Sequence, residues 1–218
     1  LPLILSLNTQ SLYKMLSRQF STVVLALCPL FGIIFGQPVR PFAGNEAYSV
    51  EHDVNEETGK WVFSVWADGY KEEGNPEPVD ILLVSTQTKR LTVMKAMNGR
   101  DETKPRLKMR QVLKECWTMT GLKPSELKEV LGYRIENTDM QKAIADCRAG
   151  MSLQSGNSFE IASTETDTAR KACWERLGKT IFSSAIRGAI SDFDINKQLI
   201  QIKVDNGGNW DHVYYEFS

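Results

Sequence analysis

The two histidines of the chain are the residues best suited to acid–base chemistry. His52 follows Glu51, and His212 follows Asp211, so each imidazole stands beside a carboxylate. Two imidazoles and a carboxylate on one surface could move protons as a ribonuclease does, one accepting a proton from a ribose hydroxyl and the other donating to the leaving oxygen. The alternative is structural, because His52 shares the strand parity of Val50 and would then help to cover the core.

The four cysteines form the second set of reactive residues. The pattern K-x-C-W-x-x-x-G occurs at residues 114–121 and again at 171–178, and the similarity stops at its edges. We therefore interpret the two copies as helices that converge on a common core, each offering a small buriable sulfur beside a large aromatic ring. An internal duplication would have left a longer stretch of similarity.

Three cysteines, Cys116, Cys147 and Cys173, follow the apolar N-terminal segment that contains Cys28. We expect a disulfide between Cys116 and Cys173 first, which would stabilise the fold by about 4 kcal/mol in the chain-entropy model. A bond that uses Cys147 is the alternative, and three buried thiols are the remaining possibility. No metal site is expected, because the chain has no tightly spaced C-x-x-C pattern or histidine cluster.

Signatures of other catalytic mechanisms are absent from the sequence. There is no G-x-S-x-G nucleophile elbow, and the glycine-containing stretch DNGGN at 205–209 lacks the lysine and the following helix of a phosphate-binding loop. A cofactor is therefore not expected. Candidate catalytic residues reduce to His52, His212 and Glu51.

Alternating hydrophobicity predicts strands at both ends of the chain. It predicts three β-hairpins, which pair residues 48–54 with 60–67, 79–85 with 91–97, and 197–204 with 210–217. The last hairpin has the strongest turn signal, because its two strands flank an Asn-Gly pair. Residues 133–136 and 158–162 are expected to be short additional strands.

The spacing of apolar residues predicts helices in the middle of the chain. Helices are expected from Pro105 to Gly121, over 124–131, from Thr138 or Asp139 to 151, and from Thr166 or Asp167 toward 190 with a possible break. Hairpins at both ends and helices between them indicate an α+β fold. We expect an antiparallel sheet built from the N- and C-terminal hairpins, with three to four helices packed on one face.

An apolar run at residues 20–35 differs in character from everything that follows it. It is shorter than the roughly 20 residues of a membrane-spanning helix. We therefore expect a signal peptide at 15–36, cleaved near Gly36, after an upstream extension at 1–14. A linker at 37–44 and a single α+β domain at 45–218 would follow, giving a secreted protein without a membrane anchor.

The charge balance bears on possible partners. The chain has a formal net charge of −1, and residues 1–36 contain basic residues but no acid. Removing them would make the chain more acidic. Broad nucleic-acid binding is therefore not expected, because it usually requires a basic excess or a basic stripe.

The last predicted strand offers a binding surface. If its odd-numbered residues 213–217 enter the core, Trp210, His212 and Tyr214 lie on the opposite side, with Lys203 across the hairpin. Such an aromatic stripe suits a sugar ring or a protein partner. The alternative is a sheet that is covered on both faces.

The layout of a signal peptide followed by one small, cysteine-poor α+β domain without an enzyme motif resembles the secreted candidate effectors of filamentous fungi. The aromatic-x-Cys signature of the ribonuclease-like mildew effectors is missing near the expected mature N-terminus, which argues against that activity. The resemblance implies a non-enzymatic recognition protein that binds a host protein or a cell-wall glycan. The alternative is a secreted ribonuclease-like or other hydrolase that uses His52 and His212.

Overall fold

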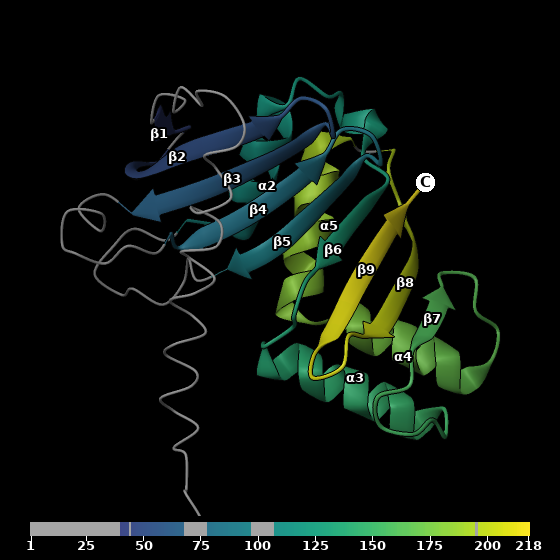
Figure 1. Cartoon of the computed structure of the whole chain (residues 1–218). Helices are drawn as coiled ribbons and strands as arrows, with labels where there is room; N and C mark the ends of the chain where they lie inside the picture. The colour runs from purple at the N-terminus through teal and green to yellow at the C-terminus, as the bar shows by residue number, and fades with distance from the viewer. Residues whose placement is uncertain (1–39, 44, 68–77, 97–106, 195) are drawn as a thin grey trace, which may run out of the picture. The chain divides into compact units, whose positions relative to one another are not determined.

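A mixed β-sheet is the framework of the computed structural model, which describes residues 40–43, 45–67, 78–96, 107–194 and 196–218. Within these residues, nine strands form one sheet. In spatial order they are β1 (Arg40–Phe42), β2 (Asn45–Asn55), β3 (Lys60–Ala67), β4 (Asp80–Ser85), β5 (Arg90–Ala96), β6 (Glu129–Gly132), β9 (Asp211–Phe217), β8 (Leu199–Asn206) and β7 (Phe159–Ala162). Among the described pairs, β5 and β6 are parallel and the others are antiparallel (Figure 1).

Four helices of the described residues pack in pairs and cover one side of the sheet. They are α2 (Met109–Met119), α3 (Thr138–Gly150), α4 (Thr168–Gly178) and α5 (Ile181–Phe193). Helix α2 packs against α5, and α3 packs against α4. In the described part of the chain, no helix has the length and apolar character needed to cross a membrane. The nine-stranded sheet and these four helices together form the expected α+β fold.

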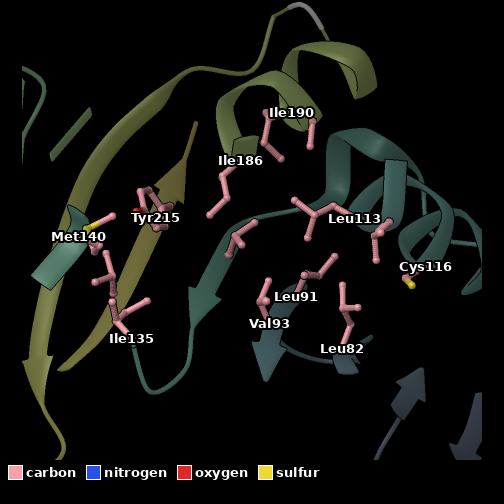
Figure 2. Close-up of a cluster of buried hydrophobic side chains, with 14 of the residues drawn as sticks. Leu82, Leu91, Val93, Leu113, Cys116, Ile135, Met140, Ile186, Ile190 and Tyr215 are labelled. Atoms are coloured by element: carbon pink, nitrogen blue, oxygen red, sulfur yellow. The ribbon is translucent and has the colours of Figure 1, made fainter. Parts of the chain in front are cut away.

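The hydrophobic core lies between the sheet and these helices. Figure 2 shows Leu91 of β5 facing Leu113 of α2 and Ile186 of α5, while Tyr215 of β9 lies near Met140 of α3. All five side chains are buried. The core therefore runs continuously from the N-terminal hairpins to the C-terminal one.

Two buried polar contacts tie the helices to β9. The Tyr215 hydroxyl lies 2.8 Å from Ser183 Oγ, which in turn lies 2.8 Å from Thr180 Oγ1. Arg148 of α3 donates two hydrogen bonds to the Asp211 carboxylate, at 2.9 and 2.6 Å. Because a buried polar group is costly without a partner, these contacts fix where α5 and α3 meet the sheet.

The three expected hairpins are confirmed, but several boundaries in the middle of the chain were wrong. The expected linker contains β1. The expected helix at 124–131 is instead a short 3₁₀ turn, Pro124–Glu126, followed by β6. Residues 133–136 follow β6 and are not a strand. The possible break in the last long helix is present, between Gly178 and Ile181. The expected segments at 1–14 and 15–36 lie outside the described residues, while Gln37–Ser218 forms one compact unit.

The disulfide joins Cys147 to Cys173, with their Cα atoms 5.0 Å apart. The expectation of a bond between Cys116 and Cys173 was therefore wrong, and the alternative through Cys147 is the one observed. Cys116 is a free, buried thiol on α2. The two K-x-C-W helices do contribute to one core, but each packs against a different helix, so their sulfurs do not meet.

Side chains from the chain itself cover the edge of the sheet at β7. The carbonyl of Glu160 accepts a hydrogen bond from Arg170 Nη2, and the amide of Ala162 donates to Glu165 Oε1 at 3.3 Å. Arg170 and Glu165 also form an ion pair at 2.7 Å. Unpaired backbone groups on an edge strand are a template for pairing with another chain. The side chains of Arg170 and Glu165, which occupy such groups on β7, are here called the edge clamp.

Loss of the disulfide should lower the free energy of unfolding by about 3.5 kcal/mol, because the bond closes a loop with a sequence separation of 26 residues. Urea denaturation with and without reductant would measure this loss. A Cys147→Ala/Cys173→Ala variant should be insensitive to the reductant, whereas Cys116→Ala should keep the wild-type response. A reductant effect in the double variant would contradict the assignment.

Removal of the edge clamp should promote self-association. In an Arg170→Ala/Glu165→Ala variant, the outward backbone groups of β7 would lose their partners and could pair with a second copy. Light scattering coupled to size-exclusion chromatography would detect the larger species. Arg176→Ala is the matched control, because it removes an exposed α4 arginine whose ion pair is with Asp146. Equal behaviour of the two variants would contradict a protective role.

Candidate functional site

The two histidines that the hydrolase alternative would bring to one substrate are far apart. His52 lies on β2 opposite Phe63, and His212 lies on β9 opposite Asp205. Five strand spacings of about 4.8 Å separate β2 from β9, so the imidazoles are on the order of 20 Å apart. They also face opposite sides, because Phe63, opposite His52, belongs to the buried core, while His212 alternates with buried Val213. The shared surface that the hydrolase alternative requires is therefore not formed by these two residues.

His52 is a structural residue at the margin of the core. Its ring stacks on Trp61 with centroids 5.1 Å apart and contacts Phe63 at 5.8 Å. Burial lowers the pKa of His52, and the positive charge of Arg40 lowers it further, while Asp53 opposes the shift. The neutral imidazole is therefore favoured in the folded protein.

His212 near the start of β9 and Trp210 just before β9 lie beside the turn that joins β8 to β9. The His212 ring stacks on Tyr133 with centroids 4.6 Å apart, and its Nδ1 accepts a hydrogen bond from the amide of Arg134 at 3.1 Å. A Cβ added at Gly207 would lie 2.2 Å from His212 Nε2, so the ring also packs against the turn. The Trp210 carbonyl accepts a hydrogen bond from the Gly207 amide at 2.8 Å. These contacts give His212 a positioning role in the turn.

The side of the sheet opposite the helices, here called the open face, is covered by none of the described helices (Figure 1). Tyr214 lies on this face, directly opposite Lys203 on β8. Lys203 Nζ lies 5.3 Å from the Tyr214 ring centroid, and Arg90 Cζ of β5 lies 5.6 Å from it. Lys203 pairs with Asp205 at 2.7 Å, and Arg90 pairs with Glu129 of β6. We call these five residues the Tyr214 strip.

Electrostatics within the Tyr214 strip couple neighbouring strands. Burial raises the pKa of Glu129, and Arg90 opposes this shift. The negative charge of Glu216, which lies directly opposite on β9, raises the pKa of Glu129 further. The hydrogen bond to Asp205 raises the pKa of Lys203. Ion pairs of this kind hold the charged groups in place around the ring, which suits contact with a partner surface.

Apolar side chains continue the open face toward β3 and β4. Val62 is 38% exposed and lies directly opposite Leu83. Ile81, two residues away on the same side of β4, is half-buried. Glu51 also faces this side, where it accepts a hydrogen bond from Trp66 Nε1 at 3.0 Å, and so it does not assist His52. The open face thus combines an apolar region with the charged Tyr214 strip.

Of the four residues expected to bind a partner, the structure brings Tyr214 and Lys203 into contact. It places His212 near the start of β9 and Trp210 in the adjoining turn. Arg90 was missed as part of this surface, because the expected hairpin left it in the turn between 85 and 91, whereas it is the first residue of β5. Glu129 was missed because its segment was expected to be helical. In the described residues, no group of three or more metal-binding side chains is present.

Comparison of the chain with protein-family models, curated proteins and solved structures finds no match. No relative therefore supplies residue roles for the Tyr214 strip.

The lowered pKa of His52 predicts a pH-dependent stability. The unfolded chain takes up a proton near the ordinary pKa of 6.5 while the folded protein resists it, so stability should fall as the pH drops below about 6.5. A His52→Phe variant should lose this part of the dependence while keeping an aromatic ring beside Trp61. Urea denaturation of both proteins at neutral and mildly acidic pH would measure the difference. An equal loss on acidification in both would contradict the prediction.

Proposed function

We propose that this chain is a secreted recognition protein that binds a partner protein through the open face of its sheet and performs no chemistry of its own. The observation that carries the proposal is the Tyr214 strip, in which an aromatic ring on the open face lies between Arg90 and Lys203. Tyrosine and arginine are enriched among the residues that dominate protein interfaces.

The composition of the open face supports a protein partner. Val62 and Leu83 offer apolar area beside the ion pairs of the strip, which resembles the apolar centre and polar rim of protein interfaces. A sugar ring that stacked on Tyr214 would compete with two cations that already lie over the tyrosine ring. This competition favours a protein over a cell-wall glycan.

Secretion is supported by two observations. The apolar segment at 20–35 has the features of a signal peptide. The Cys147–Cys173 bond is compatible with an oxidising compartment, where disulfides persist. The alternative hydrolase is not supported, because its two histidines lie on opposite faces of the sheet and cannot reach one substrate.

A Tyr214→Thr/Lys203→Thr variant should bind its partner at least about tenfold more weakly, because it removes the aromatic anchor and one flanking cation. Threonine keeps the strand propensity of both positions. Wild-type and variant proteins would be immobilised and exposed to extracellular and cytosolic fractions of a host, with quantitative mass spectrometry of the captured proteins.

The control is Lys142→Ala, which removes an exposed lysine of α3 that pairs with Asp146 at 2.9 Å. Proteins captured equally by wild type and control, but lost with the double variant, are the expected result. Capture that the double variant leaves unchanged would refute the open face as the binding surface. Sedimentation with chitin or β-glucan is the parallel arm, and binding there that depends on Tyr214 would replace the protein partner by a glycan.

A further inference from the structure

A hollow of about 270 Å³ lies where helices α4 and α5 meet the beginning of β8 and the end of β9. Its apolar lining includes Trp174, Ile190, Leu199 and Phe217, and its charged lining comes from Arg187 and Lys197. We call it the Trp174 hollow. A concave, largely apolar site with a few polar groups is the usual form of a small-molecule site.

The two tryptophans of the K-x-C-W pattern differ in a way that points to this hollow. Trp117 of α2 is fully buried, and its indole N–H donates to the Lys123 carbonyl at 3.2 Å. Trp174 of α4 is only half-buried and lines the hollow. In the described part of the chain, its indole N–H has no hydrogen-bond partner. The second tryptophan thus leaves both an aromatic surface and a donor available.

The charge of the lining selects the kind of ligand. Its charged residues are Arg187 and Lys197, and both are basic, although the whole chain is slightly acidic. Arg187 Nη2 donates to the Gly178 carbonyl, and Lys197 Nζ donates to the Ser218 carbonyl at 3.0 Å. A guanidinium has five N–H donors and an ammonium has three, so each group keeps donors for an anion.

We propose that the Trp174 hollow binds a small amphipathic anion, with a flat apolar or aromatic body and one carboxylate. The body would lie against Trp174 and the apolar floor formed by Leu199 and Phe217, where burial of apolar surface favours it. The carboxylate would accept hydrogen bonds from Arg187 and Lys197. The volume restricts the ligand to one smaller than a typical drug-sized molecule.

This site is separate from the open face, because Phe217 has the strand parity of the buried Tyr215, whereas Tyr214 faces the opposite side. A ligand in the hollow would therefore not touch the Tyr214 strip. Loss of anion binding should therefore leave partner binding at the Tyr214 strip intact, and loss of partner binding should leave anion binding intact.

The test uses naphthoate as the anionic probe and naphthalenemethanol as its uncharged counterpart, titrated into the disulfide-bonded protein by calorimetry. Naphthoate should bind with one-to-one stoichiometry and at least about tenfold more tightly than the alcohol. Arg187→Gln and Lys197→Gln should each weaken naphthoate binding by about tenfold and leave the alcohol unaffected, because each removes a charge-assisted hydrogen bond. Trp174→Leu should weaken both probes.

Arg176→Gln is the matched control, because it neutralises an α4 arginine that pairs with Asp146 instead of lining the hollow. This variant should bind naphthoate as the wild type does. If Arg187→Gln does not fold, Lys197→Gln and the comparison of the two probes still decide the outcome. Absence of saturable naphthoate binding, equal binding of both probes, or binding indifferent to Trp174→Leu would each overturn the proposal.

Discussion

The pairing of β6 with strands on both of its sides is the constraint on which the rest of the structure depends. Its neighbour Lys128 donates from its amide to the Lys89 carbonyl and accepts from the Phe217 amide, each at 2.9 Å. The four residues of β6 thereby join the strands that precede them in the chain to the strands that close it. Val130 turns toward the helices and is buried, so Glu129 must face the other way.

This register aligns the residues of the open face. Arg90 lies opposite Glu129, and Tyr214 lies opposite both Leu131 and Lys203, because the strands that carry them are neighbours in the sheet. A shift of β6 by one residue would turn Glu129 toward the helices and expose Val130. The core and the candidate binding surface are therefore set by the same hydrogen-bond ladder, and neither could change register alone.

Local signals were enough to predict the hairpins, but not the middle of the sheet. Asn206-Gly207 and the alternation around it specify a hairpin within a few residues, whatever the rest of the chain does. The segment that became β6 has Leu127 and Leu131 at helical spacing, and its strand partners are distant in sequence. Tertiary pairing overrode the local preference there. Glu129 was missed for this reason, whereas the side of Tyr214 followed from strand parity alone.

The disulfide pairing and the separation of the two histidines could not be predicted either, because both depend on residues that are distant in sequence. The sequence places Cys116, Cys147 and Cys173 on apolar helix faces, but only the packing of α3 against α4 brings two of them within bonding distance. The parity of His52 correctly indicated a place beside the core. Its distance from His212 depends on the strand order, which no local pattern contains.

The burial of Cys116 affects how stable the disulfide pairing is against exchange. Desolvation raises the pKa of its thiol well above the ordinary value, and the negative charges of Asp80 and Glu115 add to the shift. Thiol–disulfide exchange requires a thiolate that can reach a disulfide sulfur, and a buried, protonated Cys116 meets neither requirement. In the folded protein, the Cys116 thiol therefore cannot attack the Cys147–Cys173 disulfide, which is protected from exchange within the same molecule.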